Sequence, residues 1–192
     1  MEQVSKQETE EILRLAEQTL PVAGDFVELG CYKGETSLRL AQLLKAHGSN
    51  KKLWLYDSFA GLPEKTTEDA STAGDQFKAG ELFVSKREVV EKFKRSGLPF
   101  PVIKKAFFED LDPVSDLPAA IAFAFCDGDL YGSIKTSLKL VLPKLASGGV
   151  IVVHDYNNPE LPGSSCAVDE FLRAHPDFRL AQRHTLAILT RR

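Results

Sequence analysis

The chain has 192 residues, of which 43% are hydrophobic and 27% charged, the balance of one ordinary globular domain. Its 24 Lys and Arg and 27 Asp and Glu give a formal net charge of −3. The sequence lacks the basic stripe that is typical of a nucleic-acid surface, and no apolar run reaches the roughly 18–20 residues of a membrane span. We therefore expect a partner that is neither a nucleic acid nor a membrane.

The N-terminal residues and the cysteines predict a cytoplasmic location. Residues 1–11 are polar and lack the apolar stretch of a signal peptide. Cys31, Cys126 and Cys166 form no metal-type pair, and each lies among apolar or small residues. An odd number of cysteines without an export signal favours reduced thiols that pack as small hydrophobes.

Helical and strand patterns of apolar residues alternate along the chain. The patterns predict helices over residues 4–20 (within a leading segment 1–24), 35–46, from 85 onward, 130–145 and 166–174, and strands over 25–29, 52–56, 102–106, 121–126, 150–153, 178–182 and 186–190. Such alternation favours an α/β fold, a doubly wound, mostly parallel seven-stranded Rossmann-like sheet that ends in a C-terminal antiparallel hairpin. We expect residues 1–192 to form a single domain of this kind.

One long segment, residues 58–84, breaks the alternation. It contains Gly61, Pro63, Gly74 and Gly80 among polar residues and has no clear period. Because a loop of this length inside a compact domain usually has a function, we predict that it is a lid over a site.

The turn after the first strand contains two glycines, and their spacing differs from that of a pyrophosphate-binding turn. Gly30 and Gly34 are separated by three residues, whereas a pyrophosphate-binding turn has the pattern G-x-G-x-x-G. Glu28 would repel a phosphate but could hold the ammonium group of an amino-acid moiety. Tyr32 in this turn either covers a ligand or packs against the protein. Asp57 directly follows the second strand, where a carboxylate can accept the ribose hydroxyls of an adenosine.

Polar and aromatic residues also follow the next three strands. Phe108 and Glu109 come after the third strand, Asp127 after the fourth, and His154 and Asp155 after the fifth. Because ligands of open α/β sheets bind at the carboxyl ends of the strands, we expect these residues to converge on one site. Asp129 is interpreted as the N-cap of the helix that follows it.

Several strings of residues resemble the macrocin O-methyltransferase family. They are Phe26-Val27-Glu28-Leu29-Gly30, Asp57-Ser58-Phe59-Ala60-Gly61-Leu62-Pro63, Asp127-Gly128-Asp129-Leu130-Tyr131, Gly148-Gly149, Asp155-Tyr156 and Ala167-Val168-Asp169-Glu170-Phe171. The resemblance covers about residues 25–175. It implies a class I S-adenosylmethionine-dependent methyltransferase that acts on sugar hydroxyls of natural products, with a divalent metal, Mg²⁺ in the type cases.

The resemblance also implies roles for individual residues in binding the cofactor. Glu28 and Gly30 would line its methionine end, and Tyr32 and Asp127 are also predicted to bind the cofactor. Asp57 would hold the ribose and Ser58 would lie beside it. Phe108 and Glu109 would border the adenine.

Asp127 and Asp155 would be metal ligands, and Asp127 and His154 would lie closest to the chemistry. A metal that binds substrate oxygens lowers the pKa of a hydroxyl group, and carboxylates suit Mg²⁺. The family commonly has an acidic residue where this chain has His154. As a third ligand His154 would favour softer ions such as Mn²⁺ or Zn²⁺, and as an alternative it would be a base.

Other departures from the family limit what the resemblance implies. The chain has no histidine between His47 and His154, where the family's proposed lid histidine is expected. It is also short at the N-terminus, where relatives build part of their substrate pocket and their oligomer contacts. The acceptor is therefore predicted only as a small hydroxylated molecule, and a homo-oligomer remains open.

Two alternatives compete with a metal-assisted O-methyltransferase. One is a nicotinamide-dependent oxidoreductase on the same sheet, against which the absence of G-x-G-x-x-G argues. The other is a non-catalytic module that binds S-adenosylmethionine.

Overall fold

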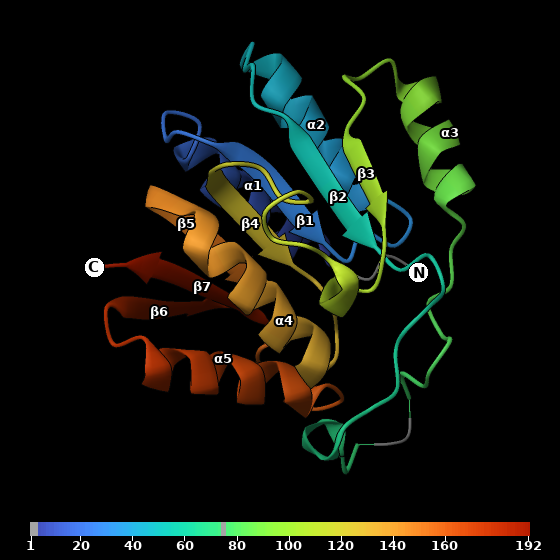
Figure 1. Cartoon of the computed structure of the whole chain (residues 1–192), viewed down its shortest axis with the longest axis vertical. Coiled ribbons are helices and arrows are strands. Elements are labelled where there is room, and N and C mark those ends of the chain that lie inside the picture. Colours follow the sequence, from blue (N-terminus) through green and yellow to red (C-terminus); the bar gives the residue numbers. More distant parts are fainter. Residues whose placement is uncertain (1–3, 74–75) are drawn as a thin grey trace.

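The computed structural model describes residues 4–73 and 76–192, and these residues form one mixed sheet with helices on both faces (Figure 1). Its strands have the order β3-β2-β1-β4-β5-β7-β6. They are β1 (Asp25–Leu29), β2 (Leu53–Asp57), β3 (Val102–Lys105), β4 (Ile121–Cys126), β5 (Leu145–Val153), β6 (Phe178–Arg183) and β7 (Leu186–Arg191). Strands β1 to β5 pair in parallel, and β7 runs antiparallel to both β5 and β6. The predicted α/β sheet and its C-terminal hairpin are confirmed.

Each face of the sheet carries its own core. The helices are α1 (Lys6–Gln18), α2 (Glu35–Ala46), α3 (Lys86–Ser96), α4 (Tyr131–Val141) and α5 (Pro162–Ala174), with short 3-10 helices η1 (Thr67–Asp69), η2 (Phe108–Asp110) and η3 (Leu142–Lys144). Figure 1 shows α4 and α5 on the near side of the sheet, where they cover strand residues such as Val27 and Ile151. The opposite core joins α1, α2 and α3 to strand residues such as Phe26 and Phe125. Neighbouring strand residues serve opposite cores because their side chains alternate between the two faces.

The predicted helix over 130–145 is too long, and the strand after it starts earlier than predicted. Helix α4 ends at Val141, and η3 places Pro143 in its first turn. Proline has no amide hydrogen, so it cannot continue the helical hydrogen-bond ladder. Strand β5 then begins at Leu145 rather than at residue 150, with a register irregularity against β4.

Helix α5 starts at Pro162, four residues before the predicted start at residue 166. A proline in the first turn loses no hydrogen bond, since the first amides of a helix have no partner within it. The interpretation of Asp129 as an N-cap is also wrong. Leu130 is the N-cap of α4, and it makes no side-chain cap hydrogen bond.

Residues 58–73 and 76–84 belong to the connection between β2 and α3, and they lie beside the starts of α4 and α5 (Figure 1). The amide of Tyr131 in α4 donates to Oδ1 of Asp69 at 2.7 Å, and the hydroxyl of Ser71 donates to the Pro159 carbonyl at 2.7 Å. Leu62, Phe77 and Leu82 of this connection pack with Leu130 and Leu161. Gly74 and Asp75 of the predicted lid lie outside the described residues, as do residues 1–3 of the predicted leading segment.

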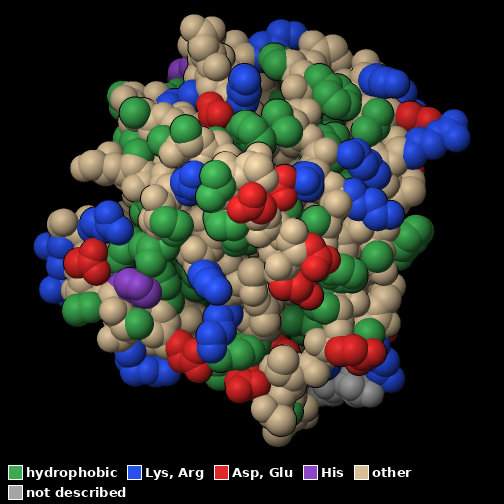
Figure 2. All heavy atoms as spheres, viewed as in Figure 1, with side chains coloured by type: hydrophobic (Ala, Val, Ile, Leu, Met, Phe, Trp, Pro, Cys, Tyr) green, Lys and Arg blue, Asp and Glu red, His purple; other side chains and the backbone are tan. Residues whose placement is uncertain are grey.

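The surface shows no segregation of charge on the face drawn in Figure 2, where Lys and Arg side chains are interspersed with Asp and Glu. Within residues 4–73 and 76–192, none of the helices is both long enough and apolar enough to span a membrane.

Candidate active site

The candidate site lies where the strand order reverses, between the carboxyl ends of β1 and β4. The two turns that leave these strands touch, because the amide of Asp127 donates to the Leu29 carbonyl at 2.8 Å. Gly30 has a φ of +92°, and a Cβ added there would lie 2.0 Å from the carbonyl oxygen of Asp127. Only glycine fits this close approach at this backbone angle. Gly30 thus brings the first turn against the backbone of Asp127.

Asp57, at the end of β2, holds the same turn from the other side. Its Oδ2 accepts the amides of Cys31 and Tyr32 at 3.0 and 2.9 Å, and its Oδ1 accepts the amide of Phe59 at 2.8 Å. Burial raises the pKa of the Asp57 carboxyl, although these three hydrogen bonds act in the opposite direction. Because three backbone amides donate to this carboxylate, it orders the turn around Tyr32. Asp57 also lines the first cavity described below, where a ligand could contact it.

Glu28 lies under the turn and is almost fully buried, with 1% of its surface exposed. The hydroxyl of Ser37 donates to its Oε2 at 2.5 Å. Burial, together with the nearby charges of Asp127 and Asp57, raises the pKa of Glu28 well above its usual value. A cationic ligand group beside Glu28 would offset this cost of ionisation.

Two adjoining cavities contain the residues predicted to bind the cofactor. The first opens to solvent and is lined by all of them except Glu28, namely Gly30, Tyr32, Asp57, Ser58, Phe108, Glu109 and Asp127. The second lies between α1 and the first turn and is lined by Glu28, Gly30, Tyr32 and Asp127. The structure therefore brings the predicted set together, with Gly30, Tyr32 and Asp127 at the junction of the two cavities.

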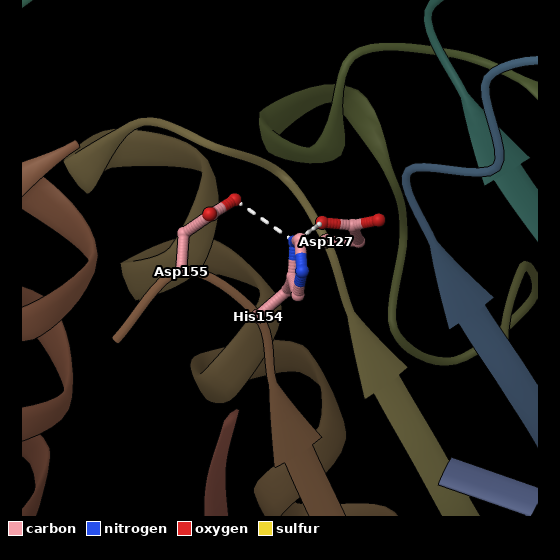
Figure 3. Close-up of side chains that lie close together, drawn as sticks. All are labelled: Asp127, His154 and Asp155. Carbon is pink, nitrogen blue, oxygen red and sulfur yellow. Dashed lines mark ion pairs between the residues drawn. The ribbon is translucent and has the colours of Figure 1, made fainter. Parts of the chain in front are cut away.

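The three predicted metal ligands converge at the ends of β4 and β5 (Figure 3). Nδ1 of His154 lies 2.8 Å from Oδ1 of Asp127 and 2.9 Å from Oδ2 of Asp155. One ligand atom from each residue falls within 4.8 Å of the other two. Asp155 has a φ of +58°. Backbone strain of this kind persists where the surrounding structure holds a side chain in place.

The donor set fits a divalent cation. Nδ1 of His154 is a buried polar atom without a hydrogen-bond partner in the described part of the chain, although two carboxylate oxygens lie beside it. A buried atom in this position is expected to have a partner, and a cation between the nitrogen and the two oxygens would supply one. Two carboxylates and one imidazole suit ions such as Mn²⁺ as well as Mg²⁺.

The charges around His154 favour a cation as well. Burial by itself lowers the pKa of His154, but the facing carboxylates of Asp127, Asp155 and Glu8 outweigh burial and raise it well above its usual value. Burial raises the pKa of Asp127. Positive charge is therefore stabilised at this point, whether a proton on the ring or a metal ion supplies it.

Several residues that line the site were not predicted from the sequence. The side-chain amide of Asn158 donates to Oδ1 of Asp155 at 2.8 Å, which leaves Oδ2 facing His154. Phe77 and Leu82 give the first cavity apolar lining, and Asp129 also lines it. Asn158 could have been predicted as a site residue, because it ends the polar run that begins at His154. No local pattern predicts that residues 77 and 82 line the cavity.

The strand order and the polar residues at its reversal define a cofactor-binding α/β domain with a candidate metal centre. The chain matches the model of the macrocin O-methyltransferase (TylF) family over residues 5–178. It belongs to that family. The predicted family is confirmed, and this membership argues against the alternative of a nicotinamide-dependent oxidoreductase.

Known relatives are similar to this chain in sequence and in fold. Demethyldecarbamoylnovobiocin O-methyltransferase of Streptomyces niveus is 33% identical over 158 residues, which are 78% of this chain and 58% of that enzyme. A tetracenomycin rhamnosyl 4'-O-methyltransferase of Streptomyces olivaceus is 32% identical over 142 residues, 70% of this chain and 54% of that enzyme. The solved structure of the O-methyltransferase NovP superposes with a TM-score of 0.81 at 27% identity, covering 96% of this chain and 78% of that one. This chain thus spans little more than half the length of these curated relatives.

Proposed function

We propose that this protein is an S-adenosylmethionine-dependent O-methyltransferase that uses a divalent metal and methylates a hydroxyl group of a small molecule. One observation carries the proposal. Asp127, His154 and Asp155 converge around a buried imidazole nitrogen that forms ion pairs with both carboxylates but has no hydrogen-bond partner among the described residues, on the wall of the first cavity. Family membership supports the same reaction.

The cofactor would lie across the junction of the two cavities. Glu28 would pair with the ammonium group of its methionine moiety, and the half-buried Asp57 would face the ribose. Phe108 is buried at the wall of the first cavity, and Glu109 is exposed at its rim, so both would border the adenine. Asp127 lines both cavities, which supports a position of its carboxylate beside the transferred methyl group.

Asp127, His154 and Asp155 would hold the metal, which when bound lowers the pKa of an acceptor hydroxyl and orients it. The methyl carbon would pass from the cofactor sulfur to the acceptor oxygen. The C–O bond would form as the S–C bond breaks, and the electron pair of the broken bond would remain on S-adenosylhomocysteine. We propose that a carboxylate oxygen of Asp127 accepts the hydroxyl proton, because this residue is common to both cavities.

The acceptor is proposed to be a glycoside with a deoxysugar. The first cavity combines an apolar wall of Leu62, Phe77 and Leu82 with the polar side chains of Ser133 and Asn158. A deoxyhexose has an apolar face and a hydroxylated edge, which match these two kinds of wall. The curated relative from Streptomyces olivaceus acts on a rhamnosyl group, as its name states.

Calorimetry and a turnover assay test the proposal together. We expect the purified protein to bind S-adenosylmethionine and not NAD, and to release S-adenosylhomocysteine with a panel of deoxysugar glycosides that lack one O-methyl group. Asp127→Asn should reduce turnover by at least about 100-fold, because it weakens both the metal set and the proton acceptor. Its affinity for S-adenosylmethionine should change by less than about threefold.

Failure to bind S-adenosylmethionine would contradict the central proposal. Cofactor binding without turnover of any acceptor would favour the non-catalytic module instead.

A further inference from the structure

Glu8 is a buried carboxylate on α1 that the proposed reaction does not yet use. Only 5% of its surface is exposed. Its Oε2 accepts the amide and the hydroxyl of Ser5 at 3.0 and 2.6 Å, which forms a capping box at the start of α1. Its Oε1 accepts the amide of Thr185 at 3.3 Å and also the Thr185 hydroxyl. One carboxylate therefore joins the first turn of α1 to the turn between β6 and β7.

The same carboxylate faces His154. Oε2 of Glu8 lies 3.7 Å from Nε2 of His154, and the two side chains are only 7% and 5% exposed. The other ring nitrogen, Nδ1, faces Asp127 and Asp155 on the opposite side. The His154 ring also meets Phe125 edge to face, with ring centroids 6.2 Å apart. Carboxylates and an aromatic ring thus surround the imidazole and define its orientation.

A carboxylate that faces one nitrogen of an imidazole affects how the other nitrogen binds a metal. Histidines that bind metals almost always donate the N–H of their second nitrogen to a carboxylate, a carbonyl or water, which fixes the tautomer and increases the basicity of the ligating nitrogen. With its proton on Nε2, facing Glu8, His154 presents the lone pair of Nδ1 to the space between Asp127 and Asp155. The hydrogen bonds from Ser5 and Thr185 keep Glu8 in place.

We propose that Glu8 is a positioning residue for the metal centre, which acts through Nε2 of His154 to direct Nδ1 at a divalent cation. The proposal rests on the proposed function, since it requires His154 to be a metal ligand. It also connects α1 to the metal centre, although α1 contributes no ligand of its own.

Binding of Mn²⁺ to the purified full chain tests this proposal. Glu8→Gln keeps an oxygen at the Oε1 position that can accept from Thr185. Its NH2 group at the Oε2 position loses the bond from the Ser5 amide, and it can donate to Nε2 and so favour the wrong tautomer. We expect Mn²⁺ to bind about 10- to 100-fold more weakly to this variant. The imidazole ¹⁴N coupling of bound Mn²⁺, measured by electron spin echo spectroscopy, should weaken in parallel.

A second capping box provides the matched control. Ser85 and Glu88 at the start of α3 repeat the motif of Ser5 and Glu8, and Glu88 is exposed to solvent. Glu88→Gln should therefore leave the Mn²⁺ affinity and the ¹⁴N coupling unchanged. In a His154→Asn background, Glu8→Gln should change the Mn²⁺ affinity by less than about twofold, whereas a purely structural effect would add equally in both backgrounds.

The outcomes separate this proposal from the proposed function. If wild type binds no Mn²⁺, the proposed metal centre fails and this proposal fails with it. If wild type binds Mn²⁺ and loses it in Asp127→Asn, but Glu8→Gln binds as well as wild type, the metal centre stands and the role of Glu8 is refuted. An equal loss of affinity in the wild-type and His154→Asn backgrounds also refutes it.

Discussion

The contact between Gly30 and Asp127 leads to a quantitative prediction. In Gly30→Ala the new Cβ would lie 2.0 Å from the Asp127 carbonyl oxygen, well short of an ordinary C···O contact of about 3.4 Å. The φ of +92° adds strain of about 1–2 kcal/mol for any residue with a Cβ. Overpacking of this kind costs about 1–3 kcal/mol more. We expect the variant to lose about 2–5 kcal/mol of unfolding free energy.

Gly48→Ala provides a control for the backbone strain alone. Gly48 also has a positive φ, +60°, but a Cβ added there would have no atom within 4 Å. This variant should lose only about 1–2 kcal/mol. At roughly 2–4 °C for each kcal/mol in a domain of this size, thermal unfolding should separate the two variants.

The affinity for S-adenosylmethionine should fall in Gly30→Ala and not in Gly48→Ala, because only the former distorts the turn of Gly30 and Tyr32 that lines both cavities. Equal melting temperatures and equal cofactor affinities of the two variants would refute this account of the turn.

Two further predictions concern buried carboxylates. Asp69→Ala leaves the buried amide of Tyr131 without its acceptor, so we expect a loss of about 1–3 kcal/mol in denaturant unfolding and faster proteolysis within residues 58–84. Asp69→Asn keeps one oxygen for the Tyr131 amide but not the second oxygen for the Thr66 amide, so it should lose less than Asp69→Ala. For Glu28, a pKa that is higher in the folded than in the unfolded state means that stability falls as the pH rises above its unfolded pKa of about 4.3. The Glu28→Gln variant does not suffer this loss. Without cofactor, its free energy of unfolding minus that of wild type should therefore increase from about pH 5 to about pH 8. An equal difference at both pH values would contradict the explanation.

Much of the fold could be predicted because its signals are local. Buried strands such as Ile121–Cys126 are apolar throughout, and the residues at strand ends follow from where each apolar run stops. Asp57, Asp127 and Asp155 could therefore be placed at one edge of the sheet before their contacts were known. The start of α5 was placed too late because Pro162 and Gly163 are typical of loops when they are considered without their surroundings.

The parts of the site that could not be predicted depend on contacts between distant residues. Ser5-Lys6-Gln7-Glu8 has the pattern of a capping box, but that pattern predicts only the local bond to Ser5 and not the approach to His154. Likewise, Asp69 contacts the start of α4 across 62 residues of sequence. Neither contact has a periodicity or a motif from which it could have been inferred.

The bond between Glu8 and Thr185 spans 177 positions of the chain, and it determines when the centre around His154 can be completed. During synthesis, Asp127, His154 and Asp155 leave the ribosome before β7, which must still insert between β5 and β6. Contacts of such long sequence separation form late, because the loop that they close costs entropy before the contact offsets it. If Glu8 positions His154 as proposed, a nascent chain that ends before Thr185 would carry the three candidate ligands without the contact that orients the imidazole.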